Sequence, residues 1–139
     1  MKIKNKNEIK NWISGVESIS QDEVKFLHCN DYRDGPLEGV MELKGKKYYF
    51  LACDGDEEAE NGGVRSYAVI EMSKDQQDKE DYFHDLFVSH VGSHFEYDKS
   101  GKLMPDKELK DKTEQDKFYS EYARSEGFLI EKSQVKAKF

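Results

Sequence analysis

Residues 37–72 read LEGVMELKGKKYYFLACDGDEEAENGGVRSYAVIEM, and this stretch decides the fold. Three runs in it are rich in Val, Ile, Tyr and Phe, which fit the pleated, half-buried surface of a sheet. The first two runs are joined at Gly45-Lys46, so the three together predict an antiparallel meander. The middle run, Tyr48–Cys53, is apolar at every position and therefore predicts a central strand that is covered on both faces.

Two amphipathic helices are predicted, one before and one after the meander. The first covers residues 7–17, where apolar residues recur with the spacing of one helical face: Ile9, Trp12, Ile13 and Val16. Either Asn5 or Asn7 is its N-cap. The second helix begins after Ser73, which has the spacing of a capping box with Gln76. We expect this second helix to cover one face of the sheet.

The remaining elements complete an α+β domain. Val24–Cys29 is a further predicted strand, and Pro105 opens or precedes a helix in the charged segment 106–126, which should dock only through its last two turns. In residues 135–139 apolar residues alternate with lysines, a pattern typical of an edge strand whose lysines face water. The sequence therefore predicts a single domain, residues 1–139, with an antiparallel sheet of four to five strands packed against two or three helices.

The negative charge of the chain is concentrated in its middle. The net charge is −7, but residues 31–98 hold 17 acidic and 7 basic side chains, which gives −10, while both ends are slightly basic. A field of this sign repels nucleic acid and anionic membranes and attracts a cationic partner. The alternative interpretation is that the charge only keeps the protein soluble.

Seven carboxylates in this segment are the candidate partner-binding residues. The meander topology would allow some of them to gather at one end of the sheet: Asp31, Asp34, Asp54, Asp56, Glu57, Glu58 and Glu60. The eight tyrosines also suit a binding surface, because each combines a large apolar ring with a polar tip. The plainer explanation is that the acids form a solvated loop and that the tyrosines are core and rim residues.

A metal site or an active site has weaker support. His84, His90 and His94 lie close together in the sequence, and with Glu96 they would supply enough ligands for zinc. On a helix, however, His84 and His90 are about 120° apart, and Gly92 separates His90 from His94. We expect no metal, cofactor or catalytic residue. The alternative is a small metal-dependent enzyme or ligand-binding domain that uses His90, His94 and nearby carboxylates.

The acidic loop and the cysteines are also poor candidates for chemistry. Asp54 opens a pattern of alternating acids that resembles a calcium loop, but Ala59 stands where Gly is needed and Arg65 where the bidentate Glu is needed. His28 and Cys29 are adjacent in a predicted strand, so their side chains point to opposite faces and cannot pair. An active site assembled from distant residues stays open.

The sequence carries no sign of export or of a membrane span. No apolar stretch follows the basic N-terminus, and no run approaches the roughly 18 apolar residues that a span needs. Cys29 and Cys53 lie in apolar runs, as buried free thiols of a reducing compartment would. We therefore expect a cytoplasmic protein.

Four motifs follow one another in residues 34–98: DGPLEGVMEL, KYYFLA, RSYAVIE and YFHDLFVSHVG. In this order they resemble small bacterial proteins of unassigned function, a resemblance that transfers no functional residue. In size, acidity and lack of catalytic motifs the chain is also similar in type to immunity proteins of bacterial toxin systems and to phage-borne inhibitors.

The function that we expect is therefore protein binding. The chain would act as a small acidic inhibitor or immunity protein that neutralises a partner with a basic surface, and it would bind neither nucleic acid nor membranes. A third interpretation is a structural subunit or a homodimer that uses the exposed edge strand.

Overall fold

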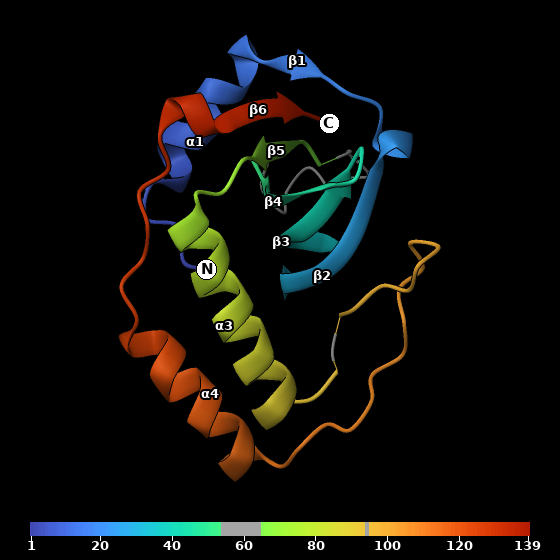
Figure 1. The fold of residues 1–139 in the computed structure, drawn as a ribbon, viewed down its shortest axis with the longest axis vertical. Coiled ribbons are helices and arrows are strands. Elements are labelled where there is room, and N and C mark those ends of the chain that lie inside the picture. The colour runs from blue at the N-terminus through green and yellow to red at the C-terminus, as the bar shows by residue number, and fades with distance from the viewer. Residues whose placement is uncertain (54–64, 94) are drawn as a thin grey trace.

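The computed structural model describes residues 1–53, 65–93 and 95–139. The α-helices in these ranges are α1 (Lys6–Trp12), α3 (Lys74–His90) and α4 (Lys112–Arg124). The strands are β1 (Glu17–Ser18), β2 (Val24–Tyr32), β3 (Pro36–Leu43), β4 (Lys46–Ala52), β5 (Tyr67–Ile70) and β6 (Val135–Lys138). The predicted α+β class is confirmed (Figure 1). None of the described helices is long and apolar enough to cross a bilayer.

The described strands form one mixed sheet of six strands, whereas the prediction was an antiparallel sheet of four to five. Their order is β1-β6-β5-β4-β3-β2, and each neighbouring pair is antiparallel except β1 and β6, which are parallel. The sequence did not reveal β1 because that strand is two exposed residues long. Such a strand is too short for an alternation of apolar and polar residues to be recognised.

The C-terminal strand β6 is not the edge strand that was predicted. It lies between β5 and β1, so the edge invoked for a homodimer is already paired with another part of the chain. Its alternation was interpreted correctly, because Val135 and Ala137 are buried and Lys136 is exposed. The alternation of apolar and polar residues indicates which face of a strand is exposed to solvent, but it does not indicate how many neighbouring strands pair with it.

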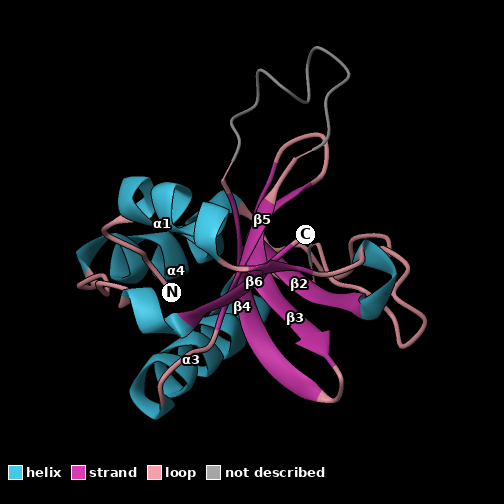
Figure 2. Ribbon diagram, turned by 90° about the horizontal axis from the view of Figure 1, so that it is seen from above, coloured by secondary structure: helices cyan, strands magenta, loops and turns pink. Residues whose placement is uncertain are grey.

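Strand β4 is the buried centre of the sheet, as predicted. Tyr49 and Leu51 pack on one face with Ile9 of α1, and Phe50 packs on the other face with Tyr67. The three described α-helices gather on one side of the sheet, and the N-terminus lies among them (Figure 2).

Helix α3 does not cover the sheet with its apolar stripe, contrary to the prediction. Its buried residue Phe83 and its C-cap residue Val91 pack with Phe118 of α4 in a separate cluster, and α3 and α4 lie side by side (Figure 1). The first half of α3 contributes two buried polar residues, Gln76 and Glu80, and Glu80 contacts β2. The prediction failed because an apolar stripe can pack against a helix as well as against a sheet.

The three described α-helices differ in how their N-termini are capped. Ser73 and Gln76 form the predicted capping box of α3, in which each side chain accepts a hydrogen bond from the backbone N–H of the other, at 3.2 and 2.9 Å. Helix α4 starts only after Asp111, its N-cap. Asn5 makes no side-chain cap for α1. Its buried side chain instead donates to the carbonyl of Ile130 and accepts from the N–H of that residue, at 2.9 Å each.

Gly39 sets how closely β3 approaches β2. A Cβ atom at this position would lie 2.1 Å from the carbonyl oxygen of His28 and 2.8 Å from the Cα atom of Cys29. The register of the two strands shifts next to both of these β2 residues. The irregular pairing leaves His28 facing α3 and Cys29 in the core of the opposite face, as their adjacency predicted.

Candidate functional site

Two of the seven predicted partner-binding residues are described, and both are exposed. Asp31 lies near the end of β2, and Asp34 lies in the turn to β3 with a φ of 51°. The other five lie outside the described residues: Asp54, Asp56, Glu57, Glu58 and Glu60. No described side chain forms an ion pair with Asp31 or Asp34, so both carboxylates are accessible.

The connection from β4 to β5 starts and ends beside this turn. The Tyr67 hydroxyl donates to the carbonyl of Pro36 at 2.7 Å, and the Arg65 guanidinium donates to the carbonyl of Arg33. Strands β2 and β4 run toward this end of the sheet, while β3 and β5 run away from it. The β2–β3 turn, which contains Asp34 and follows Asp31, and the β4–β5 connection are therefore anchored at the same end of the sheet.

His84 and His90, two of the three histidines considered for a metal site, contact different carboxylates. His84 contacts Glu96 at 3.2 Å, whereas His90 contacts Glu114 of α4 at 2.8 Å, and His94 lies outside the described residues. Within residues 1–53, 65–93 and 95–139, no three His, Cys, Asp or Glu side chains converge closely enough to hold a metal ion. His90 is a partly buried helix residue, as expected.

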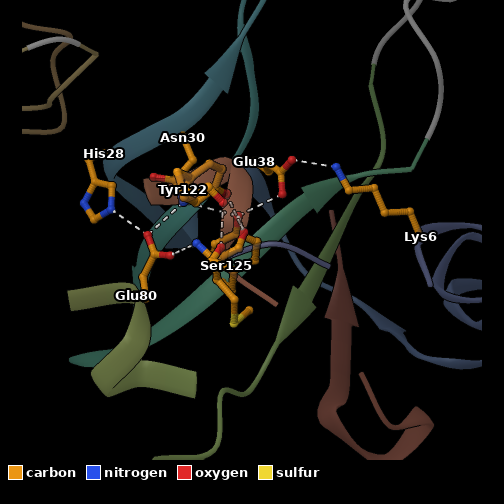
Figure 3. Close-up of polar contacts among 9 residues, drawn as sticks. Lys6, His28, Asn30, Glu38, Glu80, Tyr122 and Ser125 are labelled. Carbon is orange, nitrogen blue, oxygen red and sulfur yellow. Dashed lines mark hydrogen bonds and ion pairs between the residues drawn. The ribbon is translucent and has the colours of Figure 1, made fainter. Parts of the chain in front are cut away.

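A buried polar network joins α3 to β2 instead, and its centre is Glu80, which is only 1% exposed. One carboxylate oxygen contacts Nε2 of His28 at 3.2 Å and accepts from Nδ2 of Asn30 at 2.8 Å. The other oxygen forms an ion pair with the amino group of Met1 (Figure 3). The network thus attaches a helix, a strand and the first residue of the chain to one carboxylate.

A second branch extends from Met1 to Glu38 on β3. The Tyr49 hydroxyl contacts Oε2 of Glu38 at 2.8 Å and the carbonyl oxygen of Met1 at 3.2 Å. Tyr122 of α4 donates to the same carbonyl at 3.1 Å, and Lys6 pairs with Oε1 of Glu38 at 2.6 Å (Figure 3). Each buried polar group of this branch therefore has a partner, which is the condition for such groups to be tolerated in a core.

The network keeps the Glu80 carboxylate ionised. Burial alone raises the pKa of Glu80, but the hydrogen bond from His28 and the charge of the Met1 amino group outweigh it and lower this pKa to about 2. Burial, and then the charge of Glu38, raise the pKa of Tyr49 well above its ordinary value. A fixed carboxylate with three partners suits a structural anchor better than a proton-transfer catalyst, whose pKa should lie near the operating pH.

His28 of this network also lines an open cleft of about 540 Å³. Its wall contains two stacked imidazoles, His28 and His84, whose ring centroids are 3.7 Å apart and whose planes differ by 12°. Charged side chains from three parts of the chain also line it: Lys47, Asp81, Asp85 and Glu96. We call this the histidine cleft.

Cys29, in the core of the opposite face of the sheet, is a poor candidate for a nucleophile. The Cys29 thiol is buried and lies 3.8 Å from the Tyr97 hydroxyl. Burial is the main cause that raises the pKa of Cys29, to about 12, so the reactive thiolate is not formed near neutral pH.

The sequence analysis missed the residues at the centre of this network. Glu80 lies between buried Gln76 and buried Phe83 on α3, at helical spacings of four and three residues. A charged residue in register with an apolar stripe was the available signal. His28 was considered only as a partner for Cys29, although a histidine inside an apolar strand needs a polar partner of its own.

Comparison of the chain with protein-family models, with curated proteins and with solved structures finds no match. The functional argument therefore depends on the geometry and charge described above.

Proposed function

We propose that this protein binds a protein partner with a basic surface through the acidic end of its sheet, as an inhibitor or immunity protein does. The observation that carries the proposal is the exposure of Asp31 and Asp34 at the end of the sheet where the connection between β4 and β5 is anchored. Residues 31–34 and 54–65 contain seven acidic side chains and two arginines. Seven acids minus two arginines leave five negative charges in two segments that are anchored at the same end of the sheet.

Charge of this kind serves recognition in two ways. It accelerates the encounter with a cationic surface, and it disfavours anionic competitors such as nucleic acid. A nuclease exposes a basic surface to attract phosphates, so an acidic partner seated there would block its substrate. The exposed carboxylates at the acidic end need no rearrangement within the described residues to make such contacts.

The test is affinity capture from an extract of the source organism, followed by binding of the purified partner at several salt concentrations. The first variant is Asp31→Asn/Asp34→Asn, because Asn tolerates the positive φ of Asp34. A second variant also converts the five acids of residues 54–60 to their amides. The matched control, Glu8→Gln/Glu126→Gln, changes the charge as much as the first variant does but at exposed positions elsewhere.

We expect a basic partner whose affinity falls about 10-fold or more in the first variant, further in the second and little in the control. A 10-fold fall in affinity corresponds to about 1.4 kcal/mol of binding free energy, near the lower end of the coupling energies measured for close charge pairs across interfaces. A partner that binds the fully amidated variant as tightly as the natural chain would refute the proposal, and so would the absence of any captured partner.

Ligand binding in the histidine cleft is the second candidate function, because the volume of the cleft lies within the range of small-molecule sites and its wall carries imidazoles and carboxylates that could orient a ligand. The alternative based on His90, His94 and nearby carboxylates is untested, because His94 lies outside the described residues. A small-molecule screen followed by NMR at His84 separates ligand binding in the cleft from protein binding, and a ligand that shifts the His84 resonances would support it. Stoichiometric zinc or manganese in the purified protein would instead support the alternative based on His90 and His94.

A further inference from the structure

The contact between α3 and β2 depends on two histidines as well as on Glu80. His28 belongs to β2 and His84 to α3, and their rings stack at a centroid separation of 3.7 Å. The His28 ring contacts Glu80 at 3.2 Å, and the His84 ring contacts Glu96 at 3.2 Å. The His28 side chain is 12% exposed and the His84 side chain is 26% exposed, so neither ring is freely hydrated.

The stack accommodates one added proton far better than two. An imidazolium ring above a neutral ring is attracted to its π face, whereas two imidazolium rings at this distance repel each other. Each ring has one carboxylate partner, and these carboxylates offset part of the repulsion. Burial, and then the charge of His28, lower the pKa of His84, while Glu96, Glu80 and Asp85 act in the opposite direction.

Other titratable or charged groups face the two histidines from each element that packs around them. Asp81 and Asp85 lie on α3 beside His84, Lys47 comes from β4, and Tyr97 follows Glu96 in the cleft wall. On the buried side, the Met1 amino group already neutralises Glu80. Since the Glu80 carboxylate also interacts with Met1 and Asn30, its negative charge compensates only part of the positive charge of a protonated His28.

We propose that the His28–His84 stack is a proton-operated latch: with at most one proton it holds α3 against β2, and a second proton releases the helix from the strand. Release separates the walls of the histidine cleft and exposes Glu80. This inference is independent of partner binding at the acidic end, because it concerns a different contact.

The sign of the effect follows from the protons bound in each state. A released stack binds more protons than a closed one, so acidification below about pH 6.5 favours release. Each ring that takes up a proton on release raises the opening constant at most about 10-fold per pH unit. Well above pH 6.5 His84 is unprotonated in both states, and its contribution to the opening constant becomes independent of pH.

Hydrogen exchange of the full chain, followed residue by residue by NMR and corrected for intrinsic rates, tests the latch between pH 7.5 and 5. We expect exchange from α3 amides to accelerate by about 10-fold over this range, relative to those of β5. Imidazole nitrogen spectra over the same range should show the second proton of the pair being taken up as the α3 amides lose protection. If α3 and β5 accelerate equally, the transition is global unfolding and the latch is refuted.

The discriminating variant is His84→Phe, which keeps a ring above His28 but cannot take up a proton. We expect it to abolish the acid response of α3, and His84→Gln serves if the phenylalanine variant does not fold. His90→Gln is the matched control, because His90 lies on the same helix and pairs with a carboxylate but is not in the stack. An unchanged acid response in the His84 variants, or its loss in His90→Gln, would overturn the proposal.

Discussion

Replacing Glu80 by glutamine should be among the most damaging conservative changes in this chain. The substitution keeps the size of the side chain but removes the charge that pairs with the Met1 amino group, and both groups are buried. Glutamine also presents one oxygen where Glu80 presents two, so the contacts to His28 and Asn30 compete with the contact to Met1. One buried cation is then left without a full partner.

The magnitude can be reached by two routes. Breaking a buried ion pair by removal of one partner costs about 3–5 kcal/mol. The difference between a pKa of 4.5 and a pKa of about 2 for Glu80 corresponds to about 3 kcal/mol of stability at neutral pH. For a chain of this size, a loss of about 3–5 kcal/mol lowers the melting temperature by about 10–20 °C.

The pH dependence gives a second signature. Because the folded-state pKa of Glu80 is depressed, its stabilising contribution is complete above pH 4.5 and is lost as the pH falls from 4.5 toward 2. The natural chain should therefore lose stability in this window, and the Glu80→Gln variant should lose about 3 kcal/mol less over the same window.

Urea unfolding and thermal melts of the two proteins, at pH 7 and at several values below 4.5, measure both effects. Glu114→Gln is the control, because Glu114 also contacts a histidine but does so at the partly exposed boundary between α3 and α4. We expect it to cost far less stability than Glu80→Gln, because solvent screens this pair. If Glu80→Gln melts within about 3 °C of the natural chain, or no lower than Glu114→Gln, the network is not the anchor inferred here.

Three further predictions concern single residues in other parts of the fold. Gly39→Ala should destabilise the fold by at least about 1–3 kcal/mol in urea unfolding, because its Cβ would meet backbone at 2.1 Å, whereas Gly15→Ala meets nothing within 4 Å and should be neutral or slightly stabilising. Asn5→Ala should cost about 2–4 kcal/mol in the same assay, since it leaves the buried N–H and C=O groups of Ile130 unpaired. The Cys29 thiol, with a pKa raised to about 12 by burial, should resist a thiol reagent at pH 8 and react once the chain is unfolded; rapid labelling of the folded protein at Cys29 would contradict this.

The centre of the fold was predictable because its signal is local. Residues 48–53 lack a polar face, so β4 had to be covered on both sides, and it is. The Ser73–Gln76 capping box likewise fixed the start of α3 from four residues. These features depend on neighbours in the sequence, and a single chain displays them directly.

The features that prediction missed depend on partners far apart in the sequence. Glu80 is 79 residues from Met1 and 52 from His28, so no local sequence pattern could predict that these three residues are in contact. The same holds for Asn5, which resembles a helix cap but bonds a residue 125 positions away. A polar residue near an apolar stripe signals that a buried partner exists, but only the fold identifies that partner.

Strand β2 connects the two proposals, because it carries both the latch and the acidic end. His28 stacks on α3, Asn30 donates to Glu80, and the next residue, Asp31, is exposed at the acidic end. Release of α3 would therefore free the strand within a few residues of the proposed partner surface. If both proposals hold, acid should weaken partner binding in the natural chain but not in a chain whose stack cannot take up a second proton, because two equilibria on one strand are linked reciprocally. If only one proposal holds, the experiments show which one failed. Hydrogen exchange of α3 requires no partner, and the amide variants of the acidic end leave the histidine stack intact.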